Sequence, residues 1–389
     1  MKNSIERIEL TPLFVPFKGY VQKAMAESEG GLGMAIGAEE AWLGGDFVIC
    51  KLFSKDGSIG LGESFVWLPE TGVSPAQIID AIQISLSKYV LGENPFNIEK
   101  INFRMDANLA RNETAKGLLD MACYDLMGQI TDLPVCELIG GRNIDEIPLA
   151  ALIPLGEPML MKGLVRSYFK RGFRTFRLKL GKSIESDVKT VKAIRTIFGN
   201  KINLRVDYNQ SYTPSKAVNA IKAIEPFQID FAEQPVRADD YIGMAYVQKR
   251  INTPLMSHEG FFSLKDFITL VELGAVRVVG LNSDRPGGIT KAIEAIHYAK
   301  MRGLDVVLHN QPLGIASAMQ IHLHAAFHHS INHPSELFGQ EMLEDDLLQI
   351  SLDYSNGKVK VPDGSGWGIK LDQNALQRFA TDETIILED

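Results

Sequence analysis

Hydrophobic residues in the first third of the chain are spaced as in a mixed domain of strands and helices. Two alternating runs flank Lys55-Asp56-Gly57, a typical hairpin turn. Apolar residues at helical spacing follow, and Gly140-Gly141 marks the end of the second helical run. The predicted strands are Ile5–Val15, Phe47–Phe53 and Ile59–Phe65, and the predicted helices are Pro75–Tyr89 and Glu113–Leu138. We therefore expect an N-terminal α+β domain over residues 1–140.

The pattern changes after Ile147, where short apolar or β-branched runs alternate with amphipathic helical segments. Helices between strands are typical of parallel βαβ units, and about eight such strands close into a barrel. The predicted strands lie near Leu149–Ile153, Thr175–Leu180, Asn203–Asp207, Ile229–Glu233, Leu255–Ser257, Val276–Leu281, Asp305–Leu308 and Leu337–Gly339. The helices between them include Ser183–Ile197, Pro214–Ala223, Leu264–Glu272 and Gly288–Arg302. We predict an α/β barrel over residues 141–355.

Two segments lie outside these elements. Gly19–Glu40 is rich in glycine and follows no period, so we expect a loop there. Its Gly31-Leu32-Gly33 and Gly37 loosely match a dinucleotide-binding fingerprint, but that motif should follow a strand and open a helix. We therefore favour the loop. At the other end Lys358–Val361 looks like part of a hairpin, and we expect residues 356–389 to pack back on the N-terminal domain.

Composition narrows the class of protein. The 389 residues are 45% hydrophobic and 23% charged, as in soluble globular proteins. A net charge of −8 argues against nucleic acid as a partner, because phosphate binding needs an excess of Lys and Arg. No apolar run has membrane-spanning length, and Met1–Thr11 has no signal-peptide core. Three cysteines without metal-binding spacing favour a reducing compartment, so we expect a cytoplasmic protein: Cys50, Cys123 and Cys136.

Polar residues stand where the predicted barrel strands end, which is where barrel enzymes carry their active sites. They are Lys179, Asp207, Glu233, Glu259, Asn282, His309 and Glu341. The same interval of 26 residues separates Asp207 from Glu233 and Glu233 from Glu259, so one βα unit places each carboxylate beside the next. Oxygen ligands without thiolates suit Mg²⁺. The alternative is that each acid caps a helix or joins a surface ion pair, and the equal spacing favours the metal site.

The sequence around these acids resembles the enolase superfamily, and within it the mandelate racemase and muconate lactonizing enzyme-like members. Val206-Asp207-Tyr208-Asn209-Gln210-Ser211 is similar to the third-strand motif of mandelate racemase, and Glu233-Gln234-Pro235 is similar to the fourth-strand motif. The resemblance covers essentially the whole chain. It implies a modified (β/α)₇β TIM barrel and a capping domain completed by the C-terminal segment. It also implies that Asp207, Glu233 and Glu259 bind Mg²⁺, with Asn209 in a supporting role.

Two basic residues follow the second predicted strand. Lys179 matches the second lysine of the family's Lys-x-Lys motif, and Arg177 stands in place of the first. The resemblance implies that Lys179 is a catalytic base, and a neighbouring guanidinium and a divalent cation would favour its neutral form. Arg177 cannot act as a base, so we expect it to bind the substrate carboxylate or to tune Lys179.

His309 matches the catalytic histidine on the seventh strand of mandelate racemase and the acid-sugar dehydratases, and Gln311-Pro312-Leu313-Gly314 resembles the dehydratases. Asn282 replaces the aspartate that pairs with this histidine in those relatives. An amide orients an imidazole but does not stabilise its cation by charge, so we expect His309 to assist leaving-group departure or reprotonation. Arg285, where mandelate racemase has a lysine, and Glu341 are further candidates to bind or support the substrate.

The reaction that this resemblance implies is removal of a proton α to a carboxylate, with Mg²⁺ stabilising the enediolate. Unequal roles for Lys179 and His309 favour dehydration or cycloisomerisation of a sugar acid, that is, a lyase or isomerase. The alternative is a racemase or epimerase of a 2-hydroxy acid or an amino-acid derivative. We expect a homo-oligomer acting on a small carboxylate-containing substrate, selected by loops Tyr20–Glu40 and Phe65–Pro69. A barrel without catalytic activity and a NAD-dependent enzyme are the competing classes.

The remaining histidines have simpler interpretations. His258 precedes Glu259, and we expect it to support the site or to pack in the core. Ala316–His329 has an amphipathic helical pattern, so we interpret its i,i+4 histidines as a pair on the helix surface and not as a zinc site. Glu344-Asp345-Asp346 is expected to form a solvated acidic turn. The C-terminal histidines concerned are His322, His324, His328, His329 and His333.

Overall fold

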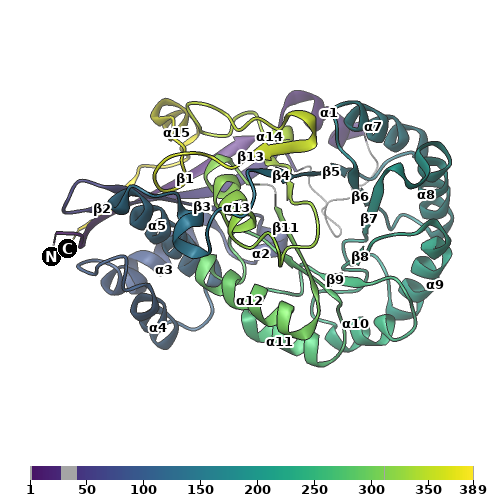
Figure 1. The fold of residues 1–389 in the computed structure, drawn as a ribbon, viewed down its shortest axis with the longest axis horizontal. Helices are drawn as coiled ribbons and strands as arrows, with labels where there is room; N and C mark the ends of the chain where they lie inside the picture. Colours follow the sequence, from purple (N-terminus) through teal and green to yellow (C-terminus); the bar gives the residue numbers. More distant parts are fainter. Residues whose placement is uncertain (1, 28–41, 311, 389) are drawn as a thin grey trace.

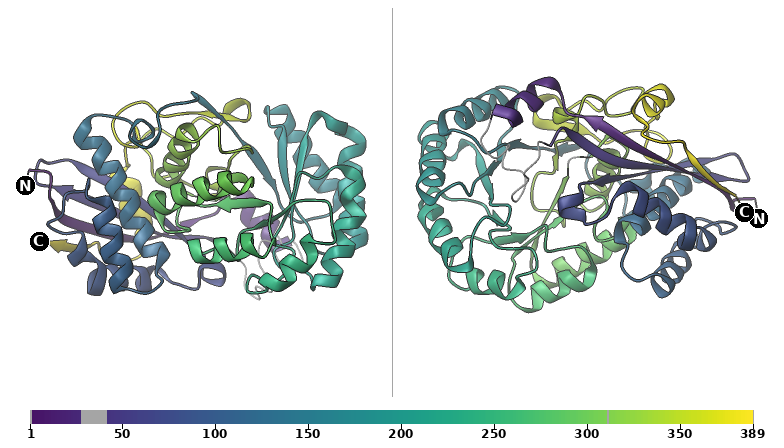
Figure 2. Two further views of the ribbon diagram at one scale, coloured as in Figure 1. Left: turned by 60° about the horizontal axis from the view of Figure 1, so that its bottom comes forward. Right: turned by 180° about the vertical axis from the view of Figure 1, so that it is seen from behind.

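The computed structural model describes residues 2–27, 42–310 and 312–388 as a capping domain beside an α/β barrel. A ring of helices surrounds the barrel strands, and the two ends of the chain lie together at the edge of the cap farthest from the barrel (Figures 1 and 2). The predicted loop Gly19–Glu40 opens with a helix, α1 (Gly19–Glu27). The rest of that loop, with its glycine fingerprint, lies outside the described residues.

The cap is built on a four-stranded antiparallel sheet in the order β14-β1-β2-β3. Its strands are β1 (Ile5–Pro16), β2 (Gly44–Ser54), β3 (Ile59–Val66) and β14 (Ile385–Glu388). The pairing of Phe53 with Ile59 confirms the predicted hairpin, and Gly57 in its turn has a φ of 91°, which glycine adopts without strain. β14 pairs with β1, so the C-terminal segment completes the cap.

Helix α5 (Glu113–Thr131) packs closely on strand β3 because glycines face it. A Cβ on Gly60 or Gly62 would lie within 2.5 Å of a backbone oxygen of α5. The predicted helix Glu113–Leu138 is two helices. α5 ends at Thr131 and is capped by Asp132, whose φ is 57°, and α6 (Val135–Ile139) starts after Pro134. The other cap helices are α2 (Leu68–Thr71), α3 (Pro75–Ala81), which continues as a π turn and a 3₁₀ turn to Tyr89, and α4 (Ile98–Asn108).

Eight parallel strands form the barrel in the order β12-β11-β10-β9-β8-β7-β6-β5, which confirms the predicted fold class. The backbone N–H of Ala150 donates to the carbonyl oxygen of Ser335 at 2.8 Å and closes the ring between the first and last strands. Gly339 was expected in the last strand but begins a helix. The strands are β5 (Ala150–Ile153), β6 (Thr175–Lys179), β7 (Asn203–Asp207), β8 (Ala232–Glu233), β9 (Leu255–Ser257), β10 (Val278–Leu281), β11 (Asp305–Asn310) and β12 (Glu336–Leu337).

The barrel helices run over residues close to those predicted, with one difference in burial. Helix α13 is buried along its whole length, so the expected amphipathic helix is wrong, and His324 is buried against Ser335 at 2.7 Å. The helices are α7 (Pro158–Lys170), α8 (Ile184–Phe198), α9 (Pro214–Ile224), α10 (Tyr241–Gln248), α11 (Leu264–Glu272), α12 (Gly288–Arg302), α13 (Gly314–Ala326) and α14 (Gly339–Met342).

The C-terminal segment runs back along the barrel to the cap. Strand β13 (Lys358–Lys360) forms no hairpin of its own: it pairs with β4 (Glu146–Pro148), which lies just before the first barrel strand. Helix α15 (Gln373–Phe379) then leads to β14. Across residues 2–27, 42–310 and 312–388, the chain forms no helix long and apolar enough to cross a membrane.

Candidate active site

Neighbouring strands bring the three predicted carboxylates to the same end of the barrel. Lys179 of β6 pairs in register with Asp207 of β7, and Asp207 pairs with Glu233 of β8. Glu259 follows β9 by two residues, in a loop fixed by Gln234, whose Oε1 accepts backbone N–H bonds on either side of Glu259 at 3.1 and 3.2 Å. All three carboxylates are buried.

Arg177 binds the first two of these carboxylates directly. Its Nη1 lies 2.9 Å from Oδ2 of Asp207 and 2.8 Å from each carboxylate oxygen of Glu233. Its Nη2 donates to Oε1 of Glu336 at 2.7 Å. From the sequence we expected Arg177 to bind the substrate carboxylate or to tune Lys179. In the structure its guanidinium is paired with carboxylates of the protein itself.

Lys179 and Asn209 link the carboxylates to each other. The ammonium of Lys179 donates to Oδ2 of Asp207 at 2.5 Å and to Oδ1 of Asn209 at 2.6 Å. The amide of Asn209 donates in turn to Oε1 of Glu259 at 3.0 Å. Asn209 reaches both partners because its backbone has a φ of 40° and its own N–H donates to Oδ1 of Asp207. Lys179 therefore has a fixed position beside the acids.

Glu259 shows that this group of acids fits a cation. Its Oε2 is buried and accepts no hydrogen bond from the described residues. Burial, together with the charges of Asp207 and Glu70, raises the pKa of Glu259 to about 7. A buried carboxylate oxygen without a donor is stabilised by a bound cation, and oxygen ligands are those that Mg²⁺ prefers. Asp207, Glu233 and Glu259 therefore offer the type of oxygen donor that a divalent ion takes.

His258 lies against the same acids. Its Nε2 is 2.8 Å from Nη2 of Arg285, and because a guanidinium only donates, Nε2 accepts and the proton lies on Nδ1. That Nδ1 faces Oε1 of Glu233 at 3.5 Å. Glu233, His258 and His309 offer ligand atoms within 4.8 Å of one another. With Nε2 of His258 bonded to Arg285, it is Nδ1 of His258 that faces the acids.

His309 of β11 packs directly on His258, with ring centroids 4.1 Å apart. Its Nε2 is buried and has no hydrogen-bond partner among the described residues. Burial, and then the charges of Arg177 and Arg285, hold the pKa of His309 well below its ordinary range. The imidazole is therefore neutral at physiological pH, which makes it able to accept a proton.

The loop after β10 shapes the cap side of the site. Oδ1 of Asn282 accepts the backbone N–H groups of Asp284 at 3.0 Å and Arg285 at 2.9 Å, so this amide forms the turn that presents Arg285. The guanidinium of Arg285 pairs with Glu70 of cap helix α2 and lies 4.4 Å from the centre of the Phe262 ring. A cap residue thus contacts the site.

Glu341 is not brought into this group. It lies in α14, and its carboxylate accepts hydrogen bonds from both terminal nitrogens of Arg171, at 2.9 and 2.5 Å. Two acids that sequence reasoning missed do reach the site, Glu336 and Glu70. Glu336 lies one residue before the predicted last strand. Alternate side chains of a strand face the barrel interior, and this alternation could have indicated Glu336. Glu70 lies one residue past the predicted loop Phe65–Pro69.

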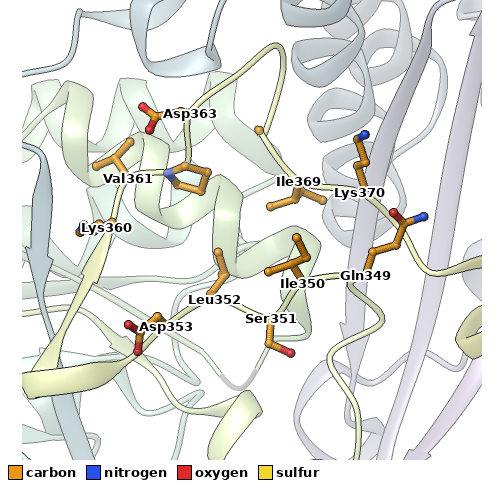
Figure 3. A pocket seen from close by; sticks show the side chains of 12 residues that line it. Gln349, Ile350, Ser351, Leu352, Asp353, Lys360, Val361, Asp363, Ile369 and Lys370 are labelled. Carbon is orange, nitrogen blue, oxygen red and sulfur yellow. The ribbon is translucent and has the colours of Figure 1, made fainter.

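Other polar groups have separate partners. Figure 3 shows a pocket over the C-terminal segments, which contains none of the predicted site residues. His322 accepts the backbone N–H of Cys136 and bonds the carbonyl oxygen of Trp367, while His333 pairs with Asp305. The predicted solvated turn is partly wrong, because Asp346 is buried and accepts the N–H of Leu348.

Comparison with known proteins shows the family of this chain. Residues 161–375 match the enolase C-terminal domain-like family, and residues 32–140 match the N-terminal domain of mandelate racemase and muconate lactonizing enzyme. The N-succinyl-L-Arg/Lys racemase of Bacillus cereus is 31% identical over 87% of this chain and 91% of its own. The hydrophobic dipeptide epimerase of Enterococcus faecalis is 36% identical over 72% and 79%.

Solved structures have the same architecture. The crystal structure of that Bacillus cereus racemase superposes with a TM-score of 0.89 at 28% identity and covers 99% of this chain and 100% of its own. The Enterococcus faecalis epimerase in complex with Mg and the dipeptide L-Leu-L-Tyr superposes with a TM-score of 0.84 at 30% identity, over 94% and 99%. The chain belongs to the enolase superfamily, in its mandelate racemase and muconate lactonizing enzyme group. It is an enzyme whose relatives are racemases, epimerases and cycloisomerases, which are isomerases.

Proposed function

We propose that this protein is a Mg²⁺-dependent racemase or epimerase that acts on the α-proton of an N-acylated amino acid or a dipeptide. The observation that carries this proposal is the likeness, over nearly the whole chain, to the N-succinyl-L-Arg/Lys racemase and the dipeptide epimerase. It supports the alternative stated from the sequence better than the dehydration of a sugar acid that we favoured there.

Inversion at a carbon needs a proton acceptor on one face and a proton donor on the other. The two candidates are Lys179 on β6 and His309 on β11. In the strand order of the sheet, the four strands β7 to β10 lie between them. Lys179 removes or returns the proton at Nζ, and the neutral imidazole of His309 does so on the other side. A divalent ion held by Asp207, Glu233 and Glu259 supplies charge that stabilises the enediolate when it is bound.

The substrate is proposed to lie between these groups and the cap. Its carboxylate needs a cationic partner, which a divalent ion held by the three acids would supply. Lys179 then stays available, in its neutral form, to remove the proton. Arg285 and Glu70 lie on the cap side and contact the remainder of the substrate. Because Lys179 and Arg285 are buried, we expect water to be excluded from the reacting carbon, which strengthens the electrostatic interactions there.

The test is hydrogen exchange at the α-carbon, followed by NMR in D₂O with Mg²⁺. The probes are N-succinyl-lysine and hydrophobic dipeptides, offered in both the L and the D configuration at the α-carbon. We expect deuterium at the α-carbon and a product of inverted configuration. Lys179→Ala should block exchange from one configuration and His309→Asn from the other, because each base serves one face. Glu341→Gln, which lies outside the site, is the control and should exchange like the wild type. Loss of water from a sugar acid without inversion of any probe would contradict the proposal.

Cycloisomerisation is the second candidate. The chloromuconate cycloisomerase of Cupriavidus pinatubonensis is 28% identical over 86% of this chain and 91% of its own. The two candidate reactions share the formation of the enediolate and differ in its fate. Turnover of cis,cis-muconate to a lactone, measured by absorbance, would favour this candidate over the epimerase.

A further inference from the structure

The guanidinium of Arg177 lies where the acids of the candidate metal site converge. It is almost fully buried, and its Nη1 alone contacts Asp207 and both oxygens of Glu233 within 2.9 Å. A divalent ion held by the same two residues would draw on these carboxylates as well. Two cations drawn to the same oxygens repel each other, and the repulsion is strong where water is excluded.

Arg177 is also anchored from behind. Its Nη2 donates to Oε1 of Glu336, and that carboxylate is fully buried in the last barrel strand. The fork of the guanidinium thus joins three carboxylates on three strands. An arginine stays charged at any pH at which the protein folds, so this positive charge is permanent.

We propose that Arg177 is an internal counter-ion that competes with the divalent ion for Asp207 and Glu233. The proposal rests on the metal site of the proposed function. It has two consequences. The chain binds metal more weakly than it would without the guanidinium. The acids stay packed together when no metal is bound, because Arg177 balances part of their charge.

The test measures metal affinity without substrate, with Mn²⁺ as the probe and free Mn²⁺ followed by electron paramagnetic resonance. Arg177→Met keeps the length of the side chain and removes its charge, and we expect the Mn²⁺ dissociation constant to fall about tenfold or more. Arg177→Lys keeps one charge but lacks the fork that joins three carboxylates, so it should bind Mn²⁺ with an affinity between the two. Both variants should melt at a lower temperature without metal and gain more from Mn²⁺ than the wild type does.

Arg205→Lys is the matched control. Arg205 is also buried inside the barrel and pairs in register with Arg177, but its Nη2 donates to the carbonyl oxygen of Pro334. This variant should bind Mn²⁺ like the wild type. The proposal is overturned if folded Arg177→Lys binds Mn²⁺ no more tightly than the wild type, if Arg205→Lys tightens binding equally, or if none of these proteins binds Mn²⁺. Because no substrate is present, a failure of racemisation leaves this result intact.

Discussion

At the scale of single residues, the position of His309 depends on a neighbour without a side chain. Gly280 in β10 lies beside β11, and a Cβ there would be 2.6 Å from Nε2 of His309 and 2.9 Å from Cε of Met256. Both distances are shorter than real Cβ contacts. The imidazole of His309 therefore occupies the space that the side chain of any residue other than glycine at position 280 would need.

Gly280→Ala tests this dependence. We expect the added methyl group to displace His309, to block the exchange that His309 performs, and to lower the free energy of unfolding by about 1–3 kcal/mol. Urea unfolding and NMR exchange in D₂O measure the two effects. Gly163→Ala in helix α7 is the control, because apart from its chain neighbours and the nearby backbone of its own helix no atom lies within 4 Å of the added Cβ. It should stabilise the protein by roughly 0.5–1 kcal/mol. Normal exchange and stability in Gly280→Ala would contradict the account.

At the scale of elements, a buried acid of the cap accepts hydrogen bonds from the start of a barrel helix. Glu63 in β3 accepts the backbone N–H groups of Leu313 at 2.7 Å and Ala316 at 2.9 Å, at the start of helix α13. This helix follows the strand that carries His309, so the cap and the catalytic side of the barrel share one buried carboxyl group. Burial raises the pKa of Glu63 to about 8, although the helix amides lower it.

This raised pKa predicts how stability changes with pH. The unfolded carboxyl loses its proton near pH ~4.3, and the folded one does so near 8, so the folded state binds more protons between these values. The contribution of Glu63 to the free energy of unfolding is therefore complete below pH ~4.3 and falls as pH rises toward 8, by at most about 1.4 kcal/mol per pH unit.

Glu63→Gln should flatten this slope between pH 5 and 8. It should also lower stability at pH 5 by roughly 1–3 kcal/mol, because its amide nitrogen cannot accept the second helix N–H. Denaturant unfolding at pH 5, 6, 7 and 8 measures both effects. A slope equal to that of the wild type would show that Glu63 does not titrate in this range.

At the scale of the whole molecule, segments far apart in the sequence meet around Asp125. This buried residue of α5 accepts the backbone N–H of Leu61 in β3 and of Trp367 in the C-terminal segment, each at 2.7 Å. The indole of Trp367 donates to the carbonyl oxygen of Leu61 at 2.9 Å. The C-terminal segment is therefore tied to the cap through α5 and β3, and Figure 1 shows this segment running beside the cap.

Asp125→Ala should loosen this junction. Two buried N–H groups would lose their acceptor, at a cost of about 1–3 kcal/mol each. We expect a lower free energy of unfolding and faster proteolysis of the C-terminal segment, followed by mass spectrometry. Asp363→Ala is the control, because Asp363 is 90% exposed and its pair with Arg142 contributes about 1 kcal/mol or less. Equal proteolysis of both variants would contradict the role of Asp125.

The sequence by itself determined the elements and their order. Strand β7 and helix α11 begin and end where they were predicted, because β-branched runs, caps and glycines act over a few residues. The 26-residue interval placed Asp207, Glu233 and Glu259 on consecutive strands, since one βα unit has nearly constant length. Those features depend on local spacing, and local spacing is visible in a sequence.

Only the tertiary structure decided which partner each side chain has. Arg177 binds two predicted ligands and Glu336, which lies 159 residues away, because closing the barrel brings the last strand near the second. Glu70 reaches Arg285 across the boundary between cap and barrel, and α13 is buried because the cap covers it. Such contacts join residues far apart in the chain, and no periodicity of the sequence encodes the distance between them.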